Sequence, residues 1–179
     1  MTLLPYPALH ASHGGIWIAQ DGKTRQVGRG EAIRIAADTP VIVLNAALVG
    51  QRLGYAELSG LDLLELFAFL HPARFMVPTL RGLARVTGLD EPARDDAIAP
   101  FFAAAAAALI DQTGGDLPER EGSWTAWQAL TRLRWPWVPL LADRLKKPEV
   151  AERWLFSKLP EWSEGAPRPA PRSITIGVE

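Results

Sequence analysis

The chain has 179 residues, 48% of them hydrophobic and 22% charged, and its formal net charge is −1. This length supports one well-buried domain, with or without a small appendage. The near-zero charge gives no global attraction to nucleic acid or anionic lipid. The lack of cysteine excludes disulfides, thiolate nucleophiles and cysteine-type zinc sites. The longest apolar run, 101–110, falls well short of the roughly 20 residues of a membrane span, and the N-terminus has no signal-peptide pattern. We expect a soluble, cytoplasmic protein that does not contact membranes.

Short β-branched and aromatic runs are interleaved with helical patterns in the first 112 residues. The runs 15–19 and 41–44 are bounded by Gly, Asp and Pro and predict strands. Residues 25–28 predict the return strand of a hairpin whose turn is Asp21-Gly22, a dipeptide suited to a type I′ turn. Residues 29–37 predict a short helix. The first part of the chain is therefore expected to be α/β.

Helical patterns dominate from Asn45 onward. Asn45 is a good N-cap for a helix that Gly54 closes after residue 53. The run 61–70 is apolar on nearly every face, which predicts a buried helix. We expect it to pack against the strand 41–44 and to end before Pro72, because proline disfavours α geometry in the residue before it.

Two more helices are expected before residue 112. Residues 80–87 predict a helix between a Thr79 cap and a Gly88 stop. Residues 97–110 predict a long alanine-rich helix, with acids just before it that suit its positive N-terminal end. Pro100 fits such a helix only in the first turn, where no backbone N–H is needed.

The chain divides by composition into an α/β domain (1–115), a Trp-rich basic helical segment (116–160) and a Pro-rich linker (161–179). The stretch 122–159 holds five of the seven tryptophans, and Ser123 is a good N-cap for a helix reaching Arg134. Alternating prolines at 167, 169 and 171 predict an extended linker.

The histidines offer little for metal binding. His10 and His13 lie three residues apart beside a Gly-Gly pair, and we interpret them as part of a surface loop. His71 precedes a proline at a predicted helix end, where a cation interacts favourably with the helix dipole.

From residue 40 to residue 110 the order of parts resembles a DEDD (DnaQ-like) 3′–5′ exonuclease of the RNase H-like fold. The strand followed by Asn45 is similar to the family's strand that ends in a His-Asn pair. The run GLDLLELFAFLHP, with Asp62, is similar to its next helix, and the Asp96-Ala97 pair before the long helix is similar to its last motif. The resemblance implies a helix-rich α/β fold with vestigial motif positions at Asn45, Asp62 and Asp96.

The departures from this family predict an inactive nuclease. Such enzymes hold two divalent metals with four acids. Their first strand carries an Asp-x-Glu pair that the run GIWIAQ lacks, and their second Asp falls on Val49 or a neighbour. Asp96 alone cannot hold two metals, so we interpret it as a helix N-terminal acid. We expect no catalytic residue and no metal in this chain.

Nearly the whole chain, including the Trp-rich stretch and the run LPEW…PRPAPR, is similar to the N-terminal region of DinG-like DNA helicases of alphaproteobacteria, which belong to superfamily 2 and are related to XPD. In those proteins an ATP-driven motor follows the linker. The resemblance implies a non-catalytic accessory domain in DNA repair or replication, whose partners are DNA, bound weakly, and the motor of the same protein. ATP and magnesium would belong to the motor, because no P-loop motif occurs here.

A local basic stretch is the candidate nucleic-acid surface, because lysine and arginine neutralise phosphates and aromatic rings stack on bases. Its residues are Arg132, Arg134, Trp135, Trp137, Arg144, Lys146 and Lys147. The spacing of Trp124, Trp127, Leu130 and Leu133 also permits an ordinary stripe that packs into the core. The alternative function is a protein-interaction scaffold without DNA binding, and an active exonuclease is the least favoured.

Overall fold

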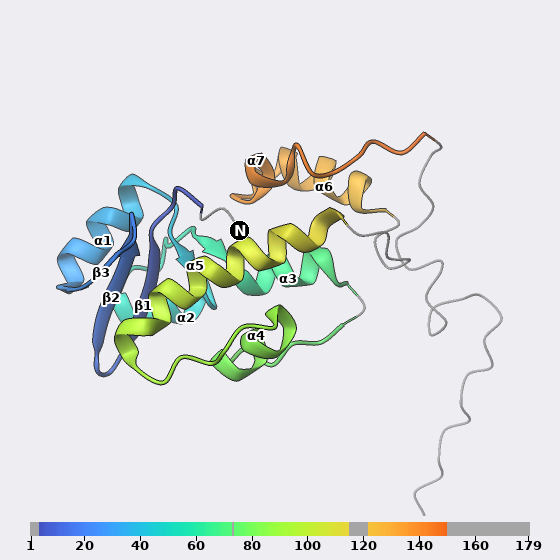
Figure 1. Ribbon diagram of the computed structural model, residues 1–179. Helices are drawn as coiled ribbons and strands as arrows, with labels where there is room; N and C mark the ends of the chain where they lie inside the picture. Colours follow the sequence, from blue (N-terminus) through green and yellow to red (C-terminus); the bar gives the residue numbers. More distant parts are fainter. Residues whose placement is uncertain (1–3, 73, 115–121, 150–179) are drawn as a thin grey trace, which may run out of the picture.

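The computed structural model describes residues 4–72, 74–114 and 122–149 and has a mixed α/β architecture built on one five-stranded sheet (Figure 1). The strands lie in the order β3-β2-β1-β4-β5. Their bounds are β1 Ala8–Ser12, β2 Gly15–Gln20, β3 Lys23–Val27, β4 Ile42–Val43 and β5 Leu61–Asp62. Strand β2 pairs antiparallel with β1 and β3, whereas β4 pairs parallel with β1 and β5. Only β2 therefore runs against the other four strands.

The hairpin of β2 and β3 confirms the sequence interpretation. Asp21 and Gly22 both have positive φ angles, 50° and 73°, as a type I′ turn requires. In contrast, the central strand β1 was not predicted, because Ala8–Ser12 contains neither a β-branched nor an aromatic residue. His10 belongs to this strand, so its assignment to a surface loop was wrong.

Helices cover both faces of the sheet. One face packs against α1 (Arg29–Asp38) and α2 (Ala46–Leu53). The other packs against α3 (Leu63–Leu70), α4 (Leu80–Thr87) and α5 (Asp95–Asp111), and α5 contacts β1, β2, β3 and β4. A short 3-10 helix, Gln112–Gly114, continues α5. Each face thus has its own apolar cluster, and the sheet separates the two.

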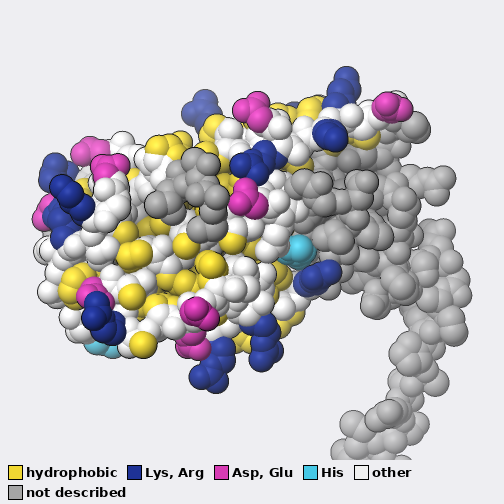
Figure 2. Space-filling view, viewed as in Figure 1, with side chains coloured by type: hydrophobic (Ala, Val, Ile, Leu, Met, Phe, Trp, Pro, Cys, Tyr) yellow, Lys and Arg dark blue, Asp and Glu magenta, His cyan; other side chains and the backbone are white. Residues whose placement is uncertain are grey.

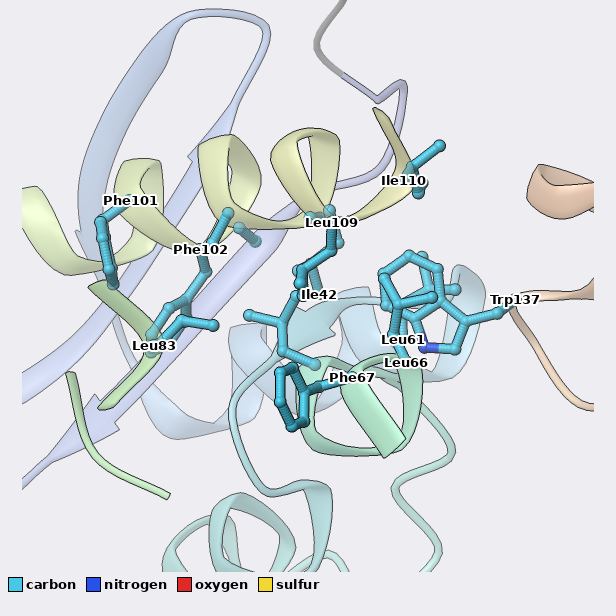
Figure 3. Close-up of a cluster of buried hydrophobic side chains, with 14 of the residues drawn as sticks. Ile42, Leu61, Leu66, Phe67, Leu83, Phe101, Phe102, Leu109, Ile110 and Trp137 are labelled. Carbon is cyan, nitrogen blue, oxygen red and sulfur yellow. The ribbon is translucent and has the colours of Figure 1, made fainter. Parts of the chain in front are cut away.

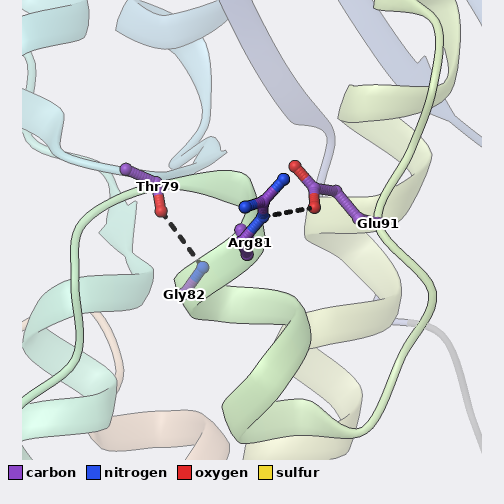
Figure 4. A network of polar contacts seen from close by, with 4 residues as sticks. All are labelled: Thr79, Arg81, Gly82 and Glu91. Carbon is purple, nitrogen blue, oxygen red and sulfur yellow. Dashed lines mark hydrogen bonds and ion pairs between the residues drawn. The ribbon is translucent and has the colours of Figure 1, made fainter.

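The predicted caps of α2 and α4 are present. The Asn45 side chain accepts a hydrogen bond from the Leu48 amide (3.0 Å), and Gly54 ends α2 with a φ of 63°. Thr79 caps α4 by accepting from the Gly82 amide (3.1 Å) (Figure 4). The same view shows Arg81 of α4 paired with Glu91 of the following loop at 3.2 Å. Because both side chains of this pair are exposed, it contributes little stability.

Two helix predictions need correction. The predicted helix 61–70 begins only at Leu63, because residues 61 and 62 form β5 beside β4. Its face toward the core is buried as expected, including Leu66 and Phe67. The long helix α5 begins at Asp95, two residues early, so Pro100 lies in its second turn. Proline there removes one backbone hydrogen bond of the helix.

The Trp-rich segment forms α6 (Ser123–Arg132) and α7 (Val138–Leu141), which lie over α3 and α5 (Figure 1). The N-cap of α6 is Gly122 with a φ of 94°, and not Ser123 as predicted. Trp137 inserts into the core cluster of α3 and α5 (Figure 3), and Leu141 belongs to the same cluster. The proposed boundary after residue 115, the C-terminal part of the segment (150–160) and the linker 161–179 lie outside the described residues.

Within the described part, no helix combines the length and the apolar character that crossing a bilayer requires.

Candidate functional site

Asp62, the second of the three positions expected from the exonuclease resemblance, has a structural role. Its side chain is buried, and its carboxylate accepts three backbone hydrogen bonds. Oδ1 accepts from Asn45 (3.1 Å) and Leu64 (2.9 Å), and Oδ2 accepts from Ala46 (2.6 Å). These donors belong to the first turns of α2 and α3, where backbone N–H groups lack helical partners. One carboxylate therefore joins the starts of two helices beside β4.

Asp96, the third of these expected positions, also makes local contacts. Asp96 accepts two hydrogen bonds from Arg94, at 3.0 and 2.7 Å. Its neighbour Asp95 approaches the β1–β2 turn instead, since a Cβ added to Gly14 would lie 2.6 Å from Asp95 Oδ2. Hence Asp95 is the acid of this pair that approaches the β1–β2 turn. In the described part of the chain no three His, Asp or Glu side chains gather in a group that could hold a metal ion.

A different set of polar groups meets at the carboxyl end of β1, and sequence reasoning missed it. Arg52 of α2 donates from Nη1 to the carbonyl oxygen of Ala11 (2.6 Å). His10 is half-buried, with its ring edge-on to Phe102 of α5 at a centroid distance of 5.9 Å. Burial lowers the pKa of His10, while the Asp95 charge raises it and the Arg52 charge lowers it. Recognising β1 as a strand would have revealed this set, because alternation places His10 and Ser12 on one face.

The cations of the basic stretch stay on the surface. Arg132, Arg134, Lys146 and Lys147 are all exposed. Arg144 is exposed too, but it pairs with Asp111 at 3.0 Å. Positive and negative side chains are interspersed on the face shown in Figure 2. The basic stretch thus consists of separate exposed cations, of which Arg144 is paired.

The tryptophans of this stretch differ from the expectation. Trp137 is 0% exposed and donates from Nε1 to the Asp62 carbonyl oxygen (2.9 Å), so its proposed stacking on a base was wrong. Burial of this large aromatic ring stabilises the fold, and this gain decided its location although its neighbours in sequence are basic. Trp135 is partly buried, donates to Glu65 Oε2 (2.8 Å) and packs against Phe69 at 5.2 Å.

The helical stripe of α6 is present in part. Trp127 packs against the core and donates to the Val138 carbonyl oxygen (3.4 Å), and its ring lies 5.1 Å from that of Trp124. Leu133, the last member of the stripe, is 76% exposed. The core interpretation therefore holds for Trp127 and fails for Leu133.

Comparison of the chain with protein-family models, curated proteins and solved structures finds no match.

Proposed function

We propose that this chain is a non-catalytic accessory domain of an ATP-dependent DNA helicase, with a degenerate RNase H-like framework of the DEDD exonuclease type. The mixed five-stranded sheet, in which β2 alone runs against the other strands and helices cover both faces, supports an α/β framework of this kind. The helicase parentage in this proposal is inferred from the resemblance of the running sequence to DinG-like helicases. ATP and Mg²⁺ would act in the motor of the same protein.

The contacts of Asp62 carry the non-catalytic part of the proposal. A carboxylate that accepts three backbone N–H bonds has little remaining capacity for a metal ion. Asp96 is likewise engaged by Arg94. The run GIWIAQ, which the sequence interpretation took as the family's first strand, is β2, and the first strand is β1. Strand β1 carries His10 and Ser12 but, like β2, no acid. A two-metal mechanism would need acids at these places.

The DNA contact in this proposal is electrostatic. Stacking contributes little, since Trp137 is buried and the Trp135 ring packs against Phe69. The exposed cations Arg132, Arg134, Lys146 and Lys147 remain available for phosphates. If three or four phosphates are neutralised, affinity for single-stranded DNA falls with salt at a log–log slope of about −2 to −3. We expect a dissociation constant in the micromolar range or weaker, because the motor would contribute most of the affinity for DNA.

Charge reversal tests this contact. The variant Arg134→Glu/Lys146→Glu/Lys147→Glu should abolish binding of a fluorescent dT oligonucleotide in anisotropy titrations, without lowering the melting temperature. A control that reverses three exposed cations elsewhere, at Lys23, Arg34 and Arg85, changes the net charge equally. The control should lose much less affinity. Equal binding by the parent and the first variant would contradict the DNA contact.

A second candidate, a docking scaffold for the motor, is favoured by a largely apolar groove of about 420 Å³ between α3 and α6. Its apolar lining consists of Ala68, Phe69, Pro72, Ala126, Leu130 and Trp135. A polar substitution such as Leu130→Asp should then weaken association between this domain and a separately expressed motor. Unchanged association, measured by calorimetry, would remove this candidate.

A further inference from the structure

The groove between α3 and α6 has a largely apolar lining with helical spacing. Its α3 side consists of Glu65, Ala68, Phe69 and Pro72, which lie three, four and seven positions apart from the first. Residues at these spacings share one face of a helix. Trp135 completes the lining, with its ring against Phe69 and its N–H bonded to Glu65. An amphipathic helix that lays its apolar face into such a groove is a common mode of recognition.

The sequence supplies an amphipathic run directly after Glu149, the last described residue. Its apolar members recur at the i, i+3, i+4 and i+8 positions of one helical face, and they are Ala151, Trp154, Leu155 and Leu159. Glu149 and Glu152 suit the positive N-terminal end of a helix. Pro160 ends it, because proline disfavours α geometry in the residue before it. The run 151–159 is therefore predicted to be a short helix with one apolar face.

This run needs an apolar surface and has one within reach. A helix of about ten residues is marginal in water unless its apolar face is buried. Leu145 and Trp135 pack against the same core cluster. The six positions from Leu145 to Ala151 can span up to about 20 Å. The groove of about 420 Å³ is thus accessible to the run without any change in the described fold.

Charge complementarity favours this occupant and gives its direction. Among the described residues that line the groove, Glu65 is the only charged one. Lys158 is the one charged residue within the apolar face of the run. Glu65 and Pro72 are seven positions apart, as are Ala151 and Lys158. A helix antiparallel to α3 therefore places Lys158 beside Glu65 and Ala151 beside Pro72.

We infer that the run 151–159 of the same chain docks as a helix in the groove between α3 and α6, with Lys158 paired with Glu65. The inference goes beyond the proposed DNA contact, which needs neither the groove nor the run. Docking fixes the point at which the predicted linker 161–179 leaves the domain, and hence where the next domain begins. The chain itself then fills the groove that the scaffold candidate leaves open to the motor.

Crosslinking in the full chain tests the docking, because the chain has no cysteine of its own. In the antiparallel arrangement the pair Ala68→Cys/Ala151→Cys lies about one helical turn apart along the groove, within the span of a short bismaleimide. At low protein concentration we expect rapid crosslinking within one chain. The control pair Thr24→Cys/Ala151→Cys places the first cysteine on the exposed strand β3 and should crosslink far more slowly.

Substitutions within the run separate docking from mere proximity. Leu155→Asp puts a carboxylate into the apolar groove and should slow crosslinking of the Ala68 pair by about tenfold or more. Phe156→Asp is the matched control, because Phe156 lies off the apolar face, and it should leave the rate unchanged. Leu130→Asp should act like Leu155→Asp from the groove side. Leu155→Asp changes no residue of α6, so it decides the question if Leu130→Asp lowers the urea midpoint.

A charge exchange tests the pair of Glu65 and Lys158. Lys158→Glu should slow crosslinking about 1.5- to 5-fold, the range expected of an exposed ion pair. Glu65→Lys/Lys158→Glu should restore the rate, since it reverses both charges. Glu65→Gln keeps an acceptor for the Trp135 N–H and should show the loss of the charge alone. A double exchange that crosslinks no faster than Lys158→Glu would contradict the pairing.

The remaining outcomes separate this inference from the proposed function. Equal rates for the two cysteine pairs, or a rate unaffected by Leu155→Asp, would overturn the docking. A crosslink between two chains would assign the groove to a second copy and would also overturn it. If crosslinking stays at the control rate while Leu130→Asp weakens association with the motor, the groove belongs to the motor. None of these results changes the outcome of the charge reversal at Arg134, Lys146 and Lys147, which tests the DNA contact by itself.

Discussion

Replacement of Trp137 tests whether the Trp-rich segment belongs to the fold of the α/β domain. The ring is 0% exposed within the cluster that also contains Leu61 and Leu66, and its indole N–H donates to the Asp62 carbonyl, 75 positions earlier in the chain (Figure 3). Truncation of a buried Trp to Ala typically costs about 3–5 kcal/mol. Trp137→Phe keeps most of the apolar volume but leaves the Asp62 carbonyl without its donor, which costs about 1–3 kcal/mol.

Urea unfolding followed by far-UV circular dichroism measures both effects without depending on tryptophan fluorescence. For a slope of about 2 kcal/mol/M, the Trp137→Ala midpoint should fall by roughly 1.5–2.5 M. Leu133→Ala is the control, because that side chain is 76% exposed and should change stability by less than about 0.5 kcal/mol. A loss below about 1 kcal/mol for Trp137→Ala would refute the packing argument. Folded Trp137→Phe should bind DNA like the parent, because the buried ring cannot stack on bases.

Four further predictions concern the core, the helix starts, pH and nuclease activity. Leu66→Ala should cost about 2–5 kcal/mol in urea unfolding, since Leu66 is fully buried, and an unchanged midpoint would show α3 to be peripheral. Asp62→Ala should destabilise the chain by several kcal/mol, more than Asp96→Ala, because it leaves three backbone donors without an acceptor; equal losses would contradict this role. The lowered pKa of His10 means that unfolded histidine, with a pKa of about 6.5, takes up its proton first as the pH falls. The free energy of unfolding should therefore decrease as the pH falls below about 6.5 and down through the folded pKa of His10. If the free energy of unfolding depends on pH in the same way in the parent and in His10→Gln, this prediction is wrong. A clean preparation should not digest 3′-ended DNA with Mg²⁺ or Mn²⁺, and digestion that disappears in Asp96→Ala would overturn the non-catalytic proposal.

Local interactions made several elements predictable from the sequence. The Asp21-Gly22 turn, the Asn45 and Thr79 caps and the glycine stops of α2 and α4 are all present. Each depends on a side chain or a backbone angle within a few residues of the feature that it controls. For the same reason the strands β2, β3 and β4 and the helices α1, α2 and α4 were found close to their observed bounds.

Tertiary packing alone decided the rest, including the candidate site. Strands β1 and β5 have weak local patterns, and they form because neighbouring strands supply their hydrogen bonds. The burial of Trp137 likewise depends on a cluster assembled from distant segments, so its basic neighbours in sequence were misleading. The orientation of Asp95 toward Gly14, with Asp96 held by Arg94, follows from where α5 crosses the sheet. Sequence therefore determined the elements that are stabilised within a few residues, whereas long-range pairing and burial determined which side chains meet at the ends of β1 and β4.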